Sequence, residues 1–103
     1  MEGIFTVEPI TIVAVLKGRA GNAKPVRDEL LKVAAASRAE DGCLDYAVHE
    51  SHACPEQFVL YETWKNESAL AEHLASRHYL AYRKAVEKWI DSREVFRLNT
   101  LSK

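Results

Sequence analysis

The sequence has no long apolar run and no block of like charge. None of its apolar stretches approaches the ~20 residues that a membrane-spanning helix needs. The 14 basic and 15 acidic residues are spread along all 103 positions and give a formal net charge of -1, so neither nucleic acid nor an anionic membrane is an expected partner. Residues 1–8 lack the basic start and apolar core of a secretory signal. We therefore expect a soluble, cytoplasmic protein.

Cysteine is scarce as well, and the common motifs of metal and nucleotide sites are missing. The two cysteines, Cys43 and Cys54, match neither a redox pair nor a zinc site. If they lie at opposite ends of an extended segment, they are roughly 20 Å apart, which is too far for a disulfide. The four histidines form no H-x-x-H or H-E-x-x-H pattern, and no glycine-rich phosphate loop is present. We therefore predict no metal and no nucleotide cofactor.

The first half of the chain predicts a strand, a helix and a second strand. Residues 10–17 (ITIVAVLK) are apolar on both faces, as in a central strand that is covered on each side. A helix follows, with Asn22 as its N-cap. It is expected to end near Glu40, because Gly42 can take a left-handed conformation there. Residues 43–50 then alternate as the second strand.

The second half predicts two more strands that flank a helical segment. The third strand covers residues 57–65, and the last covers residues 93–101. Between them, Asn66 or Ser68 can cap a short helix that runs through Ala75. Ser76 can cap a second helix, one side of which carries Tyr79, Tyr82, Val86 and Ile90.

The second and third strands can pair in either of two registers. In the first register, Leu44, Tyr46 and Val48 share a face with Trp64, Glu62 and Leu60. A shift by one residue brings Asp45, Ala47 and His49 to that face instead. We predict the first register, because it gathers the apolar residues on one side.

The order strand, helix, strand, strand, helical segment, strand is that of a ferredoxin-like split βαβ fold. This is an α+β fold in which an antiparallel sheet carries its helices on one face. The length fits one domain, which we place at residues 10–103, with residues 1–9 as an N-terminal extension. Because residues 10–16 are apolar on both faces, the other sheet face needs cover too. We expect a second copy of the chain to cover it in a homodimer.

Titratable and aromatic side chains are concentrated between positions 61 and 82. Strand alternation puts Glu62 and Trp64 on one face, and His73 lies on the apolar side of the following helix. A carboxylate, an indole and an imidazole are therefore expected to share one half-buried space. Such a combination is more typical of a small-molecule pocket than of a plain core.

A resemblance to a known family rests on four segments. These are ITIVAVLK at 10–17, EDGCLDY at 40–46, FVLYETW at 58–64 and AEHLASRHYLAY at 71–82. Over roughly residues 10–101 they resemble the antibiotic biosynthesis monooxygenase family. The resemblance implies a ferredoxin-like fold and dimers of the α+β-barrel type, with the two sheets face to face. It also implies one of several activities: oxygenation of quinols and polycyclic phenols without a cofactor, haem degradation, or isomerisation of small signalling molecules.

Two departures from family patterns narrow these activities. Haem-degrading relatives carry an asparagine in the first strand and a histidine on the last helix, whereas this chain has Val13 to Leu16 and Tyr82 to Val86 in those regions. Haem is therefore not expected. The subgroup of quinol monooxygenases has the same spacing as Glu62, Trp64, His73 and His78, so the chain looks most like that subgroup. It differs from the subgroup at Arg77, where proline is usual.

For such a reaction the candidate catalytic residues are His73, Glu62 and Trp64. His73 is the expected base, because imidazole titrates near neutral pH. Trp64 would form a wall and donate its indole N–H. Glu62 would either hold His73 in one tautomer or act as a base itself. The candidate substrate-binding residues are Tyr46, His78 and Tyr82.

The same residues also have purely structural interpretations. His73 could bond a backbone carbonyl, Trp64 could pack in the core, and Glu62 could pair with Arg83, Arg97 or a lysine. Three functions are therefore predicted as alternatives. The first is a cofactor-independent monooxygenase that uses molecular oxygen and a small aromatic substrate. The second is an isomerase or lyase on a small carbonyl compound, and the third is a non-catalytic dimer that binds a hydrophobic metabolite.

Overall fold

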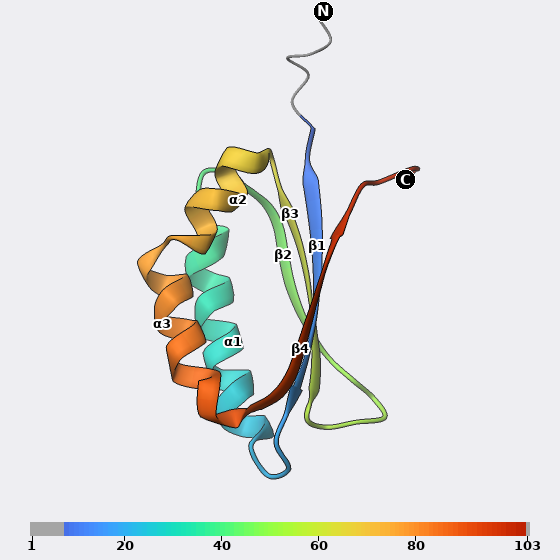
Figure 1. Cartoon of the computed structure of the whole chain (residues 1–103), viewed down its shortest axis with the longest axis vertical. Coiled ribbons are helices and arrows are strands. Elements are labelled where there is room, and N and C mark those ends of the chain that lie inside the picture. The colour runs from blue at the N-terminus through green and yellow to red at the C-terminus, as the bar shows by residue number, and fades with distance from the viewer. Residues whose placement is uncertain (1–7, 103) are drawn as a thin grey trace, which may run out of the picture.

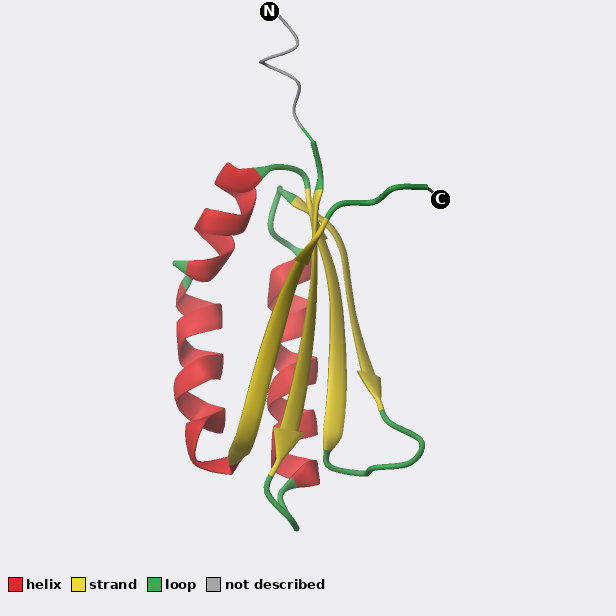
Figure 2. Ribbon diagram, turned by 45° about the vertical axis from the view of Figure 1, so that its right-hand side comes forward, coloured by secondary structure: helices red, strands yellow, loops and turns green. Residues whose placement is uncertain are grey.

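The chain folds into two layers, an antiparallel sheet and a layer of helices on one of its faces (Figure 1; Figure 2). The structure, a computed structural model, describes residues 8–102. Its elements are β1 (Ile10–Gly18), α1 (Ala23–Arg38), β2 (Cys43–Glu50), β3 (Gln57–Trp64), α2 (Glu67–Leu74), α3 (Arg77–Val86), the 3-10 helix η2 (Glu87–Trp89) and β4 (Ile90–Leu98). The strand order is β2-β3-β1-β4. The predicted ferredoxin-like α+β fold is confirmed. Residues 1–7 of the predicted N-terminal extension lie outside the described residues, so the domain boundary stays a prediction.

The core lies between the sheet and the helices. Ile12, Ala14 and Leu16 of β1 point toward the helices and are at most 6% exposed. The helix α1 covers them with residues that recur every three or four positions, which are Val26, Leu30, Val33, Ala34 and Ser37. No helix in the described part of the chain covers the opposite face of the sheet, which we call the open face. Its exposed apolar side chains are Tyr61, Phe96 and Leu98. None of the helices within residues 8–102 has the length and apolarity to cross a membrane.

The register of β2 against β3 is the predicted one for most of its length, with Tyr46 opposite Glu62. The sequence also predicts Leu44 on the face of Trp64, and this is wrong. Cys43 lies opposite Trp64 instead, because the register shifts at this end of β2. An irregularity of this kind leaves one residue unpaired, and Leu44 is accordingly turned to solvent.

Side-chain caps start the two helices that follow β3. The Asn66 side chain accepts a hydrogen bond from the Ala69 N–H at 2.8 Å, so Asn66 is the cap of α2. The Ser76 hydroxyl accepts one from the Tyr79 N–H at 3.3 Å at the start of α3. At α1, Asn22 occupies the predicted N-cap position, but its side chain makes no capping hydrogen bond.

The turn after α1 differs from the prediction. The helix ends at Arg38, which leaves Glu40 in the turn. Gly42 does not adopt a left-handed conformation; among the described residues only Gly21 has a positive φ, of 84°. Gly42 has a different reason to be glycine. A Cβ atom there would lie 2.3 Å from the Cβ of Ala69, so the turn and α2 could not approach as closely.

The C-terminal segment also departs from the prediction. The sequence predicts Ile90 on a helix face and a last strand at 93–101, but α3 ends at Val86. The 3-10 helix η2 reverses the chain within three residues, so that Ile90 is already extended and lies opposite Gly18 of β1. The strand β4 therefore starts and ends three residues earlier than predicted.

Candidate active site

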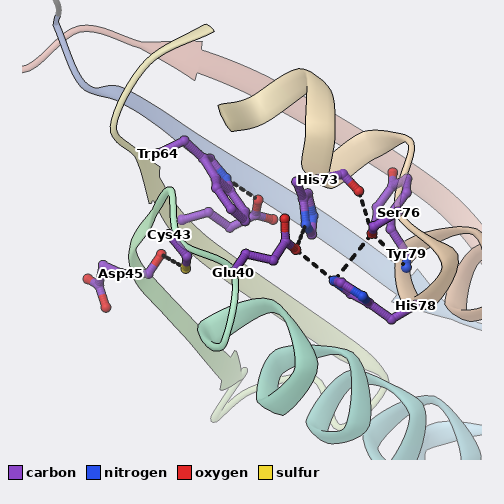
Figure 3. Close-up of polar contacts among 9 residues, drawn as sticks. Glu40, Cys43, Asp45, Trp64, His73, Ser76, His78 and Tyr79 are labelled. Carbon is purple, nitrogen blue, oxygen red and sulfur yellow. Dashed lines mark hydrogen bonds and ion pairs between the residues drawn. The ribbon is translucent and has the colours of Figure 1, made fainter. Parts of the chain in front are cut away.

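Glu40 and His73 form an acid-imidazole pair between the turn after α1 and the helix α2. His73 Nδ1 lies 2.8 Å from Glu40 Oε2 (Figure 3). A carboxylate oxygen can only accept, so the hydrogen lies on Nδ1 and Nε2 carries the lone pair. The His73 side chain is 1% exposed and that of Glu40 is 16% exposed. The pair is therefore largely shielded from water.

His78 binds the same carboxylate oxygen from the start of α3. Its Nε2 lies 2.6 Å from Glu40 Oε2 and 3.2 Å from the Ser76 hydroxyl. Ser76 in turn donates to the backbone carbonyl of His73 at 2.7 Å. These hydrogen bonds lie where α2 is connected to α3, and they fix both imidazole rings relative to Glu40 (Figure 3).

The free nitrogen of His73 is the group in this network that is available for chemistry. Nε2 is buried and has no hydrogen-bond partner among the described residues. His73 lines a cavity of about 430 Å³ between the sheet and the helices α2 and α3, and Glu62 lines it too. The walls are mainly apolar and include Ile12, Leu70 and Val95. A lone pair held beside such a cavity is suited to take a proton from a bound molecule.

Trp64 contacts both His73 and Glu62. Its ring stacks on the His73 ring, with centroids 4.3 Å apart and planes inclined by 30°. Its indole N–H donates to Glu62 Oε1 at 3.0 Å, so this hydrogen is already engaged inside the protein. Trp64 is fully buried and does not line the cavity. Trp64 therefore contacts both His73 and Glu62, and its predicted contact with a substrate stays a prediction.

The pKa shifts of the two titratable groups at the cavity have a common cause. Burial lowers the pKa of His73 below its ordinary value, and the hydrogen bond and charge of Glu40 oppose this change. Burial raises the pKa of Glu62, against the hydrogen bond from Trp64 and the charge of Arg93. Both shifts favour the neutral form, so His73 keeps a free lone pair at neutral pH.

Arginines form the polar side of the cavity. Arg83 and Arg93 each donate to the Tyr79 hydroxyl at 2.9 Å, and Arg97 pairs with Glu67. All three arginines line the cavity. The predicted ion pair of Glu62 with Arg83, Arg97 or a lysine does not form within residues 8–102; Glu62 accepts from Trp64 instead.

The other predicted residues lie close by but outside the cavity. The Tyr46 ring meets the His73 ring edge-on, with centroids 5.8 Å apart, and Tyr46 is buried. Burial raises the pKa of its hydroxyl. Tyr82 lines another cavity of about 430 Å³, which Arg83 also lines, and burial raises the pKa of Tyr82 to about 12. His78 contacts Glu40, and neither residue lines the cavity.

Glu40 is the site residue that the sequence reasoning missed. The role proposed for Glu62, holding His73 in one tautomer, belongs to Glu40 in the structure. The sequence offers one weak signal, since Glu40 lies three residues after Ser37, on the side that a longer helix would bury, but α1 ends at Arg38. A carboxylate at such a position needs a partner.

The same three side chains, Glu40, His73 and His78, are close enough to hold a metal ion. Their ligand atoms lie within 4.8 Å of one another, which no histidine motif in the sequence indicates. In the structure, His73 Nδ1 and His78 Nε2 instead form hydrogen bonds with Glu40 Oε2. This direct hydrogen bonding satisfies the carboxylate, and the prediction that the site works without a metal stays a prediction.

The fold and the site together define a small ferredoxin-like domain with a buried histidine beside a largely apolar cavity. A profile of the family described as antibiotic biosynthesis monooxygenase matches residues 9–85. The chain belongs to this family.

Individual relatives agree with the family. The chain is 37% identical over 78 residues to "Putative monooxygenase Rv0793" of Mycobacterium tuberculosis, with 76% of each chain covered. It is 28% identical over 88 residues to "Probable quinol monooxygenase YgiN" of Escherichia coli, which covers 76% of this chain and 85% of the relative.

Solved structures show the same fold. PA3566 from Pseudomonas aeruginosa superposes with a TM-score of 0.88 at 29% identity and covers 92% of this chain and 96% of its own. The structure of Rv0793 superposes with a TM-score of 0.87 at 32% identity, with 93% and 98% covered.

Proposed function

We propose that this protein is a monooxygenase that oxidises a small electron-rich aromatic compound, a quinol or polycyclic phenol, without a metal or an organic cofactor. The observation that carries the proposal is the pair of Glu40 and His73, with His73 Nε2 unpartnered at a largely apolar cavity. Membership of a monooxygenase family and the similarity to a relative named for quinol oxidation support the reaction class.

The reaction starts with the transfer of one proton from the substrate to the protein. His73 Nε2 takes the phenolic proton, and the resulting phenolate is electron-rich enough to give an electron to molecular oxygen. In the net reaction, a ring CH₂ of the keto tautomer becomes C=O and the second oxygen atom leaves as water. All four electrons come from the substrate, so no further reductant is required.

Three neighbours prepare His73 for this step. Glu40 fixes the tautomer that leaves Nε2 free and stabilises the imidazolium once it forms. Trp64 holds the ring plane by stacking. Glu62 lines the same cavity, where burial raises its pKa and so favours the protonated form, and a protonated carboxyl can donate a hydrogen bond to an oxyanion.

The homodimer belongs to the same proposal. The open face carries Tyr61 of β3 and Phe96 and Leu98 of the edge strand β4, at 41%, 46% and 44% exposure. Covering such a face with that of a second copy removes apolar area from water without any further element. Size-exclusion chromatography with light scattering tests this: the wild type should be a dimer and Phe96→Arg a monomer. A monomeric wild type would contradict it.

An isomerase or lyase reaction is the second candidate, and one observation favours it. Arg93 lines the same cavity as His73, so a proton taken from a carbon beside a carbonyl would leave an enolate close to a cation. Such a reaction consumes no oxygen, which separates it from the first candidate.

The test is oxygen consumption with a panel of quinols and polycyclic phenols in chelator-treated buffer. The wild type should consume oxygen, and His73→Ala should lower turnover by about 10²- to 10⁴-fold, as expected for loss of a general base. His52→Ala is the matched control, because His52 is exposed in the loop between β2 and β3. Turnover that survives in His73→Ala would remove His73 from the mechanism. Tight binding of a phenol without any turnover would favour the non-catalytic dimer.

A further inference from the structure

The cavity contains two guanidinium groups that both bind one uncharged acceptor. Arg83 on α3 and Arg93 on β4 both donate to one acceptor, the uncharged hydroxyl of Tyr79. Neither forms an ion pair with a carboxylate among residues 8–102, whereas the third arginine of the cavity, Arg97, pairs with Glu67. Two like charges that share a neutral partner repel each other, and an anion placed between them would remove that repulsion.

One donor of this pair is left without a partner. The Nε of Arg93 is buried and makes no hydrogen bond within the described part of the chain. A buried charged donor without an acceptor is costly, and a carboxylate is the acceptor that matches the planar fork of a guanidinium. Among residues 8–102, Glu62 is the one carboxyl that lines the cavity, but its oxygen Oε1 already accepts from Trp64.

The rest of the cavity is suited to a ring. Ile12, Ala14, Leu70, Leu74 and Val95 supply apolar surface, and the volume of about 430 Å³ is in the range of small-molecule sites. Tyr79 links the two ends of the cavity. Its ring centroid lies 5.0 Å from that of His73, and its hydroxyl receives both arginines. An anionic group held at the arginines would therefore place an attached ring within reach of His73.

We propose that the ligand of this cavity is an aromatic acid, a phenol or quinol that carries a carboxylate, and that Arg83 and Arg93 bind the carboxylate. The inference deepens the proposed function by naming the chemical class of its substrate. It depends on that function only for what happens to the ligand after binding. Arg83 and Arg93 are then specificity residues, and His73 acts on the phenolic end.

The test uses binding alone, with compounds that are stable in air. Calorimetry compares 2-hydroxybenzoate and 3-hydroxy-2-naphthoate with their methyl esters, which have the same ring and hydroxyl but no charge. At least one acid should bind the wild type about 10- to 100-fold more tightly than its ester, the range for hydrogen bonds to a charged partner. Raising the salt concentration should weaken the acid more than the ester.

Arginine variants locate the effect. Arg93→Met and Arg83→Met should each reduce the preference for the acid to within a few-fold of the ester, because acid binding weakens much more than ester binding. Arg77→Met is the matched control, since Arg77 is exposed on α3 and does not line the cavity. Thermal unfolding of each variant checks that it is folded. If one of the two variants does not fold, the other still tests the proposal.

Several outcomes would overturn the proposal. Equal affinity for acid and ester, no binding of either acid, or a preference that persists in both arginine variants would each do so. Failure of the proposed function looks different: the acid preference would be present and arginine-dependent, yet no phenolic acid or quinol would support oxygen uptake. Conversely, oxygen uptake with neutral quinols and equal affinity for acid and ester would support the monooxygenase function and contradict the proposal that the substrate is an aromatic acid.

Discussion

His73 and Glu40 lie 33 positions apart in the sequence and are joined by a hydrogen bond of 2.8 Å between Nδ1 and Oε2. The bond crosses from α2 to the turn after α1, so it depends on the tertiary fold and not on a local motif. Its consequence is chemical. It assigns the hydrogen of His73 to Nδ1 and leaves Nε2, which has no partner among the described residues, free to accept a proton.

Glu40→Gln tests this relationship. The amide oxygen can still accept from Nδ1, but the negative charge that raises the pKa of His73 is gone. The imidazole should become a weaker base, and we expect kcat/KM to fall about 10- to 100-fold, as for loss of a supporting group behind a histidine. Because the pKa of His73 falls further, the acid limb of the pH profile should move to lower pH.

The control for this variant is Glu72→Gln. Glu72 is on the same helix as His73 but is exposed, so the same loss of charge should leave both the rate and the pH profile unchanged. An acid limb that does not move in Glu40→Gln would mean that another group sets it.

The fold could be predicted from the sequence because its signals are local. Alternation along residues 10–17 and 57–64, the spacing of buried residues in α1, and the caps at Asn66 and Ser76 each depend on a few neighbouring positions. The candidate site was only half predictable. Glu62, Trp64 and His73 do meet, because the faces of a strand and a helix are set by periodicity.

What could not be predicted depends on contacts between distant segments. Glu40 belongs to a turn whose position against α2 is set by the contact of Gly42 with Ala69. The irregular register at Cys43 turns Leu44 outward, and strand alternation alone gives no sign of it. The sequence could not indicate that Arg93 and Arg83, ten positions apart, share one acceptor either.

Trp64→Phe isolates the role of the indole N–H. The change keeps an aromatic ring against His73 but leaves Glu62 Oε1 without its donor. Loss of a hydrogen bond to a buried carboxyl should lower the free energy of unfolding by about 1–3 kcal/mol, measured by urea denaturation. A double-mutant cycle with Glu62→Gln gives the interaction free energy between the two side chains, which should exceed about 0.5 kcal/mol for residues in direct contact. Strictly additive effects would mean that the bond contributes nothing to stability.

The pH dependence of stability follows from the two shifted groups, and they act in opposite directions. His73 has a lowered pKa in the folded protein, so below its ordinary value of 6.5 the unfolded chain binds more protons. The free energy of unfolding should therefore fall as the pH drops from 6.5 toward the lowered pKa. Glu62 has a raised pKa, so its contribution is present at low pH and is lost as the pH rises above 4.5.

Urea denaturation between pH 5 and 8 measures this dependence. The slope that comes from His73 can reach about 1.4 kcal/mol per pH unit, the value for one proton. It should disappear in His73→Gln and remain in His52→Gln, where the histidine is exposed. If the free energy of unfolding stayed constant below pH 6.5 in both the wild type and His73→Gln, the folded protein would not disfavour the imidazolium.

Gly42→Ala tests whether the turn after α1 holds the site together. The new Cβ would lie 2.3 Å from the Cβ of Ala69, so either the turn or α2 must move. Overpacking of this kind costs about 1–3 kcal/mol of stability. Because Glu40 lies in the turn and His73 in α2, the displacement should also lengthen the bond between them. We therefore expect lower turnover per folded molecule as well as a lower melting temperature.

Gly21→Ala provides the comparison that separates these two effects. Gly21 has a φ of 84° and no atom within 4 Å of the position of an added Cβ, so the substitution strains the backbone without any contact. It should cost about 1–2 kcal/mol of stability, similar to the change at Gly42. Gly21 is remote from the cavity in the loop between β1 and α1, so turnover per folded molecule should stay at the wild-type level. Equal turnover in both variants would mean that the turn stabilises the fold but does not position Glu40 for catalysis.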